Sequence, residues 1–456
     1  MMDSLLFTIA SFLVALGILI TVHEFGHFWV ARRLGVKVLR FSIGFGRPLW
    51  KRIGKVDGTE YVIAAIPLGG YVKMLDEREA PVAEAEQQRA FNRQSLGVRS
   101  AIVVAGPLFN FLFAILAFWL IFVTGDTGLK PLIGEVAQNS IAAEAGFRPD
   151  DQIVSVGTQP TKTWEGVVYA LLSESLDQSE LPIRVKDESG RELIHWLNTQ
   201  GLQDLAENGQ LLHNLGLTPK HPILPPVIGE LLPGEPAEQA GLQPGDLLLT
   251  ADDVPIESWS DWVEYVRDRP GRSITLEIER NGRLLSLELT PASLTDEDGK
   301  TVGRIGASVK VPPDLMDDYR AEIRYGPMAA VGHSLQKTWD LSLLMLRMLG
   351  KMVMGEVSVK NLSGPISIAD SAGKSASYGV IYFIKFLAVV SVSLGVLNLM
   401  PIPVLDGGHL FFFLIEAVKG SPLSERFMEQ GQKIGMLILL VIMGLAFYVD
   451  LNRFLG

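Results

Sequence analysis

The feature that most constrains this chain is the segment ILITVHEFGHFWVARR, residues 18–33, in which two histidines and a glutamate interrupt an apolar run. Ionisable side chains inside a membrane span are costly to desolvate, so they mark a functional site whose partners lie elsewhere in the chain. The composition favours a membrane protein, because 48% of the 456 residues are hydrophobic and only 20% are charged. The chain has no cysteine, so a metal would have to be held by His, Asp or Glu.

Four apolar segments are long enough to cross a bilayer, for which about 17–25 residues are needed. They cover residues 5–30, 101–123, 380–400 and 434–451, and the fourth is the shortest. The first segment lacks both a basic leading region and a small-residue cleavage site, so we expect it to be retained in the protein. The predicted fold class is a multi-span α-helical membrane protein with four transmembrane helices.

The distribution of charge predicts how these helices are oriented. Residues 31–99 contain 13 Lys and Arg against 7 Asp and Glu, and short loops rich in Lys and Arg stay on the cytoplasmic side. We therefore place residues 31–99 and 404–430 inside, and both termini and residues 124–375 outside. The formal net charge of −11 argues against nucleic acid as a partner, because nucleic-acid binding requires a basic surface.

The external region contains an internal repeat. Residues 133–171 align without a gap on residues 228–266, at a constant offset of 95, with eleven identical positions. Duplication of one domain explains this pattern. Each copy predicts a short strand, a small-residue helix, a turn, a second strand and a helix that follows a tryptophan. The segment AGLQPGDLLL resembles PDZ domains of bacterial envelope proteases, which bind extended peptides by strand addition. A spacer or gate with an empty groove is the alternative.

Two further segments complete the predicted organisation. FSIGFG and YVIAAIPLGGYVKM, between the first two spans, predict a β-hairpin that could dip beside the first span. HSLQKTWDLSLLMLRMLGKMVM gathers its charges on one helical face and predicts an interfacial amphipathic helix. We divide the chain into residues 1–123 with two spans and the hairpin, 127–220 and 221–310 as tandem PDZ-like α+β domains, 311–375 as amphipathic helices and linker, and 376–456 with two spans.

His23, Glu24 and His27 form an H-E-x-x-H motif. On a helix, the two imidazoles lie one turn apart on the same face and can bind zinc, while Glu24 can act as general base. A pair of structural histidines inside a helix bundle is the alternative interpretation. Catalytic zinc usually takes three protein ligands, so a third ligand must come from another segment.

The third ligand is expected in LGVLNLMPIPVLDGGHL, residues 394–410, where prolines and glycines break the helix. Asp406 lies in this break, and His409 is its rival. The predicted orientation places both Asp406 and the histidine motif in the cytoplasmic third of the bilayer. We therefore favour Asp406.

Together, H-E-x-x-H in the first span, N-x-x-P-x-P-x-L-D-G in the third, LGGYVKM and the two PDZ-like domains resemble the bacterial site-2 proteases over essentially the whole chain. The resemblance implies an intramembrane zinc metalloprotease of the bacterial inner membrane. Its substrates would be single-span membrane proteins, such as an anti-sigma factor already trimmed outside, and remnant signal peptides. This function belongs to envelope stress signalling.

Matched residue by residue, the resemblance implies that His23, His27 and Asp406 bind Zn²⁺ and that Glu24 is catalytic. It assigns substrate binding to Asn398, Pro401, Pro403, Gly44 and Gly46, with Gly44 and Gly46 in a hairpin that clamps the substrate as an added strand. Asn110 also matches the family, without an assigned role. Two other functions use some of the same features: a metal transporter, and an inactive scaffold that gathers envelope proteins.

Overall fold

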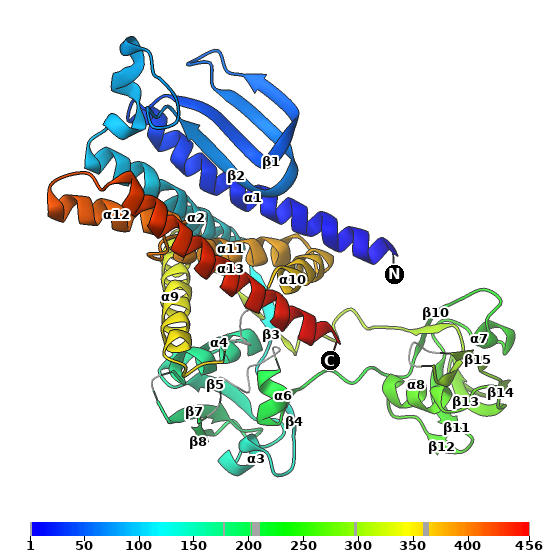
Figure 1. The fold of residues 1–456 in the computed structure, drawn as a ribbon. Coiled ribbons are helices and arrows are strands. Elements are labelled where there is room, and N and C mark those ends of the chain that lie inside the picture. Colours follow the sequence, from blue (N-terminus) through cyan, green and yellow to red (C-terminus); the bar gives the residue numbers. More distant parts are fainter. Residues whose placement is uncertain are drawn as a thin grey trace.

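The computed structural model describes residues 2–176, 178–200, 202, 210–295, 299–358 and 364–455. Within these residues, four helices are long and apolar enough to cross a membrane (Figure 1): α1 (Met2–Arg33), α2 (Leu96–Thr124), α11 (Val380–Asn398) and α13 (Glu425–Leu455). They coincide with the four predicted apolar segments. The prediction for the fourth helix was too short, because α13 begins at Glu425 and its first turns are polar.

Small residues allow α1 and α2 to approach closely. A Cβ atom on Gly26 of α1 would lie 2.3 Å from the backbone oxygen of Ala105 in α2, so only glycine fits this crossing. Farther along, Ala114 and Phe118 of α2 pack against Ala388 and Val392 of α11 in a shared buried cluster. These contacts pack α2 against α1 near the histidine motif and against α11 farther along the helix.

The predicted hairpin between α1 and α2 consists of two long, bent strands, β1 (Val38–Ile53) and β2 (Glu60–Met74). Because both strands bend, they form a sheet of four segments in the order 48–53, 60–64, 38–43 and 70–74. Phe41 and Tyr61 pack their rings on Phe28 of α1, at centroid distances of 5.4 and 5.9 Å. The sheet is thereby fixed against the helix that carries the histidine motif. Two short 3₁₀ helices, η1 (Glu84–Arg89) and η2 (Phe91–Arg93), lead on to α2.

The region between residues 126 and 323 begins and ends with two strands that pair with each other. β3 (Asp126–Leu129) pairs antiparallel with β18 (Arg320–Ile323). The predicted bounds of the first PDZ-like domain, 127–220, include most of β3, which belongs to this separate two-stranded sheet. Figure 1 shows the second PDZ-like domain set apart from the membrane helices and connected by two extended chain segments.

The two repeats fold alike. Each has a four-stranded antiparallel sheet, in the orders β6-β5-β7-β8 and β12-β11-β13-β14, and a separate pair formed by its first and last strands. The first copy comprises β4 (Ile133–Val136), α3 (Ile141–Ala145), β5 (Gln152–Val156), β6 (Gln159–Pro160), α4 (Trp164–Glu174), β7 (Glu180–Lys186), β8 (Glu192–Asn198), α6 (Leu211–Leu215) and β9 (Leu217–Pro219).

The second copy comprises β10 (Ile228–Leu231), α7 (Pro236–Gln239), β11 (Leu247–Ala251), β12 (Val254–Pro255), α8 (Trp259–Arg267), β13 (Ile274–Arg280), β14 (Arg283–Leu289), β15 (Ala292–Thr295), β16 (Thr301–Arg304) and β17 (Ala307–Val309). The hydroxyls of Thr163 and Ser258, 95 residues apart, cap α4 and α8 by accepting a bond from the backbone N–H of Gly166 and Asp261. Such a cap contributes about 1 kcal/mol to helix stability. The predicted duplication is therefore visible in the local chemistry of both copies.

In the described part of the chain, three α-helices lie outside the candidate spans and the repeats. α9 (Pro327–Val353) corresponds to the predicted amphipathic helix and contributes Leu341 to the buried cluster of α2 and α11. α10 (Pro365–Ser377) begins at a buried carboxylate of α13, because Asp450 accepts hydrogen bonds from the N–H groups of Ile366 and Ser367 at 2.8 and 3.1 Å. α12 (Asp406–Lys419) follows the broken end of α11.

Candidate metal centre

The model brings the three predicted metal ligands together. His23 and His27 lie on α1, and Asp406 is the first residue of α12. Their ligand atoms lie within 4.8 Å of one another. The Nε2 atoms of His23 and His27 are 3.2 Å apart, and Oδ2 of Asp406 is 3.2 Å from the first and 3.5 Å from the second. Three nitrogen and oxygen ligands from distant parts of the chain therefore face one point.

The spacing of these three atoms fits a tetrahedral metal ion. Zinc bonds to His nitrogen and carboxylate oxygen are about 2.0–2.2 Å long, so ligand atoms at tetrahedral angles lie about 3.3–3.6 Å apart. The observed separations of 3.2–3.5 Å match that requirement. Oδ2 of Asp406 is also buried without a hydrogen-bond partner among the described residues, which is costly unless a cation binds there. The residues present therefore fit a divalent metal.

Neighbouring groups hold both imidazoles in a ligating orientation. Nδ1 of His27 lies 2.8 Å from the backbone oxygen of Ile102, to which an Nδ1–H donates, leaving Nε2 free for metal. The side-chain amide of Asn110 lies 3.2 Å from Nδ1 of His23. When Nε2 of His23 binds metal, its Nδ1–H needs an acceptor, and a half-turn of the amide supplies the buried Oδ1 of Asn110, which has no other partner in the described part of the chain. Asn110, whose role the sequence left open, thus lies beside a predicted ligand.

Glycines leave room for the converging elements. A Cβ on Gly106 of α2 would lie 2.3 Å from Nε2 of His27 and 2.7 Å from Cε1 of His23. At the start of α12, a Cβ on Gly407 or Gly408 would lie within 2.4 Å of backbone atoms of residues 399–402. These two glycines let the broken connection after α11 fold back tightly, which places Asp406 opposite α1.

The three ligands open into a pocket of about 400 Å³. Glu24 lines this pocket, and so does the sheet segment 70–74, which begins at Gly70. A Cβ on Gly70 would lie 2.9 Å from Cγ of Glu24, so the glutamate packs directly against the strand. His409, the rival ligand, also lines the pocket but is absent from the group of three ligand atoms.

The residues expected to bind substrate lie around this pocket rather than in its lining. Asn398 ends α11, and Pro401 and Pro403 follow in the connection to α12, where Pro403 packs near Gly435 of α13. Gly44 and Gly46 lie at the bend of β1, both with positive φ, and a Cβ on Gly44 would lie 2.9 Å from the backbone oxygen of Ile66. These glycines shape the sheet, while Gly70 is the glycine that meets the pocket.

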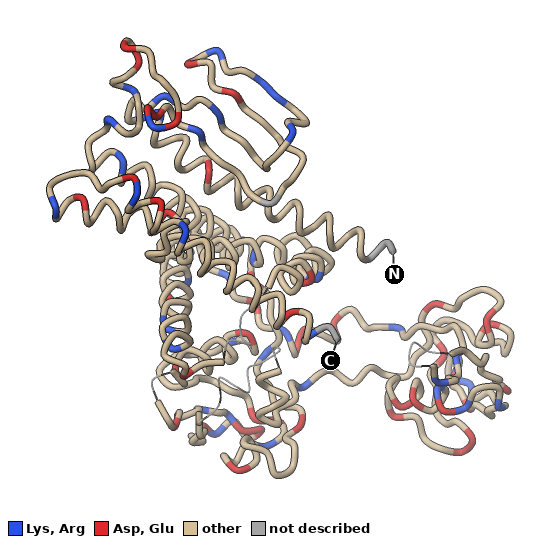
Figure 2. The backbone as a smooth tube through the Cα atoms, in the orientation of Figure 1, with Lys and Arg blue, Asp and Glu red and all other residues tan. Residues whose placement is uncertain are grey.

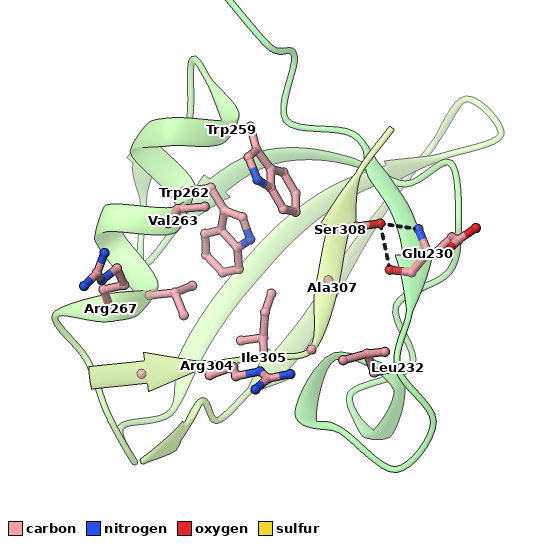
Figure 3. Close-up of a pocket in the computed structure, with 13 residues that line it drawn as sticks. Glu230, Leu232, Trp259, Trp262, Val263, Arg267, Arg304, Ile305, Ala307 and Ser308 are labelled. Atoms are coloured by element: carbon pink, nitrogen blue, oxygen red, sulfur yellow. Dashed lines mark hydrogen bonds between the residues drawn. The ribbon is translucent and has the colours of Figure 1, made fainter. Parts of the chain in front are cut away.

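A second candidate site is the groove of the second PDZ-like domain, with a volume of about 340 Å³ (Figure 3). α8 forms one wall through Trp262 and Val263, and the turn at Ile305 together with β17 forms the other. Ser308 ties β17 to β10, because its hydroxyl accepts a bond from the N–H of Glu230 at 2.8 Å. The two domains differ before their last strand. In the first domain helix α6 precedes β9, whereas in the second domain strand β16 precedes β17. A pocket of about 390 Å³ lies beside α6 in the first domain.

Comparison with known proteins places the chain in a family. The model of "Peptidase family M50" matches residues 11–442. The chain is 48% identical to the regulator of sigma-E protease RseP of Escherichia coli K12 and 47% identical to the regulator of sigma E protease of Salmonella typhi, in each case over 99% of this chain and 100% of the relative. The solved PDZ domain of the SdrC-like protein from Listeria monocytogenes is 17% identical, with a TM-score of 0.16, over 20% of this chain and 90% of that domain. The chain is thus a membrane-embedded metalloprotease and belongs to peptidase family M50.

Proposed function

We propose that this protein cuts the membrane segment of single-span membrane proteins, using zinc held by His23, His27 and Asp406. The observation that carries the proposal is the meeting, in one pocket, of a tetrahedral set of ligand atoms, the Glu24 carboxylate and the edge of a β-sheet. A metal transporter would have no use for that sheet edge or for Glu24 beside the metal. A scaffold would need neither the ligands nor the groups that orient them.

Glu24 acts as the general base. It accepts a proton from the attacking water and delivers it to the nitrogen of the leaving amine, so the peptide bond breaks without a free charge remaining. When bound, zinc supplies Lewis acidity that polarises the scissile carbonyl and lowers the pKa of water. Ile102 and Asn110 keep the Nε2 atoms of both histidines directed at the site throughout.

The substrate must enter as an extended strand, because the carbonyls of an intact helix are hydrogen-bonded and shielded. Segment 70–74 pairs with residues 38–43 on one side only, and no other strand in the described part of the chain pairs with its pocket side. An unwound substrate segment can add to this free edge, with its scissile bond beside Glu24. Gly44 and Gly46 support the edge by bending β1. We assign binding of the substrate backbone to Asn398 at the end of α11, with Pro401 and Pro403 in the connection that follows it.

The orientation follows from charge. Residues 31–99 and the site face the cytoplasmic side of the inner membrane, and the PDZ-like domains and both termini lie outside. A cysteine introduced near Lys55 or Glu84 would then be labelled only after the inner face is made accessible. One near Gly234 would be labelled in intact spheroplasts, and reversed labelling would contradict this orientation.

The names of the relatives support a role in sigma-E regulation, so the proposed substrates are an anti-sigma factor trimmed by a first external cut and remnant signal peptides. The two PDZ-like domains act mainly as a size filter that excludes untrimmed proteins. The open groove of the second domain supports a peptide-recruiting role as the second candidate.

The direct test is reconstitution of the purified chain in liposomes with a single-span test protein. We expect cleavage within the apolar segment, loss of cleavage after metal removal, and recovery when zinc is restored. Cleavage confined to the external part of the test protein would contradict an intramembrane protease.

A further inference from the structure

The sheet of β1 and β2 extends beyond the helix that supports it. Its inner segments pack on α1 through Phe28, Phe41 and Tyr61, whereas the outer segment 48–53 has one neighbouring strand and a free edge among the described residues. The register pairs Trp50 with Ile63 and Arg52 with Tyr61. Paired residues share a face of the sheet, so Trp50 and Arg52 face the same side as the rings packed on α1.

A groove of about 520 Å³ lies along this face. Its apolar lining includes Phe41, Ile43, Trp50, Tyr61 and Ile63. Trp50 and Ile63 are 49% and 45% exposed, so these two paired strands present a large apolar surface. Because the groove lies beside a candidate membrane span, the acyl chain of a membrane lipid is an apolar partner available at this position.

The mouth of the groove carries cations without acidic partners. Arg52 and Lys55 line the groove, and neither has an ion pair with a described residue. Figure 2 shows Lys and Arg along this outer part of the sheet. From α1, Arg32 donates a hydrogen bond to the Tyr61 hydroxyl at 3.4 Å, adding a third positive charge near the groove.

The acidic groups near this mouth are already neutralised. Asp57 accepts two bonds from Arg89 at 2.9 and 2.8 Å, and the Arg89 guanidinium holds the pKa of the Asp57 carboxyl below its usual value. Glu60 pairs with Lys51 at 2.5 Å and with Arg40 at 2.6 Å. The charge left over at the groove is therefore positive.

We propose that this groove binds an anionic phospholipid, with an acyl chain along Trp50 and Ile63 and the phosphate at Arg52 and Lys55. Anionic lipids give the cytoplasmic leaflet its negative potential, and each Lys or Arg near that surface contributes about 1 kcal/mol to the attraction. The choice of leaflet rests on the proposed orientation, whereas the chemistry of the groove does not. A bound lipid would fix the outer strand and so steady the whole sheet, including segment 70–74 at the metal centre.

The test measures lipid retained by the purified full-length chain. The protein is incubated with phosphatidylglycerol or with phosphatidylcholine of the same acyl chains, and the bound lipid is counted by native mass spectrometry. We expect the wild type to retain phosphatidylglycerol preferentially and Arg52→Gln/Lys55→Gln to lose this preference about 30-fold, because two cations at about 1 kcal/mol each amount to about 2 kcal/mol. Equal retention of the two lipids by the wild type, or an unchanged preference in the double variant, would overturn the proposal.

Lys51→Gln is the matched control, because Lys51 neighbours Arg52 but points to the opposite face and is paired with Glu60. It should retain lipid like the wild type, and a loss as large as that of the double variant would contradict a specific groove. Excess inorganic phosphate distinguishes the source of the ligand: displacement of the lipid by phosphate alone would make the site a phosphate site instead. In liposomes with brominated acyl chains, Trp50→Phe should remove part of the fluorescence quenching, and unchanged quenching would place Trp50 outside the lipid.

Discussion

The side-chain amide of Asn110 lies 3.2 Å from Nδ1 of His23, so a residue of α2 contacts this imidazole on the nitrogen that is not directed at Asp406. Asn110→Ala should weaken metal binding and activity by about 10–100-fold, the usual cost of losing a group that orients a ligand. The measurement is metal affinity by competition with a chelator. Asn110→Asp, which keeps an acceptor for Nδ1–H, should restore most of the affinity. An unchanged affinity in Asn110→Ala would remove this residue from the site.

Gly106 is the narrowest point between α2 and the histidine motif. Gly106→Ala should abolish stoichiometric metal binding, because the new methyl group would lie 2.3 Å from Nε2 of His27. Gly97→Ala is the control on the same helix, since a Cβ there meets nothing within 4 Å. That substitution should leave metal content unchanged and stabilise the helix by up to about 1 kcal/mol. Normal metal content in Gly106→Ala would mean that the two helices are farther apart than described.

A partly buried ion bridge links the first PDZ-like domain to the membrane helices. Lys385 of α11 lies 2.9 Å from Asp126 of β3 and 2.6 Å from Glu165 of α4. Removing one partner of a largely buried ion pair costs about 3–5 kcal/mol, and exposure of Glu165 reduces that figure here. Lys385→Met should loosen the domain and let an untrimmed substrate be cleaved, measured as the ratio of cleavage rates for untrimmed and trimmed forms.

Lys374→Met is the control for this bridge, because the ion pair of Lys374 with Asp370 lies within α10 and does not connect two domains. Its cleavage ratio should equal that of the wild type. Replacing residues 131–317 by a short linker, with β3 and β18 retained, should also admit the untrimmed substrate. If that deletion instead slows cleavage of the trimmed substrate and still refuses the untrimmed one, the domains recruit rather than filter.

The choice of third ligand predicts a difference between two residues of α12. Asp406→Ala should lose metal, because it removes one of three converging ligand atoms. His409→Ala should keep metal, since its imidazole lines the pocket outside that group. Metal content by atomic absorption decides between them, and the opposite pattern would exchange the two assignments.

The sequence predicted the motifs and the repeat because both are local patterns. H-E-x-x-H places two imidazoles on one helical face whatever surrounds them, and the offset of 95 is visible without any fold. The approach of Asp406 to His23 required one added argument, the depth of each residue in the bilayer. The structure therefore shows both the repeated domains and the approach of Asp406 to the two histidines.

Contacts between residues that are far apart in the sequence could not be predicted from local patterns. The meeting of Gly70 with Glu24 depends on how β1 and β2 bend, and the pairing of β3 with β18 joins segments nearly two hundred residues apart in sequence. The contact of Asn110 with His23 depends on the rotation of α2 about its axis, which the evenly apolar sequence of a membrane helix leaves unspecified. The polar first turns of α13 were not predicted, because a search for apolar segments excludes charged residues even when they continue the same helix.

We propose that Glu24 is the base of a metal-dependent protease whose ligands are His23, His27 and Asp406. The most direct measurement compares the wild type with Glu24→Gln in liposomes, recording zinc content and cleavage of a single-span test protein on the same sample. Glu24→Gln should bind about one zinc per chain, as expected for a site that keeps all three ligands, and lose cleavage. Wild-type turnover by a zinc-loaded Glu24→Gln variant would contradict this account.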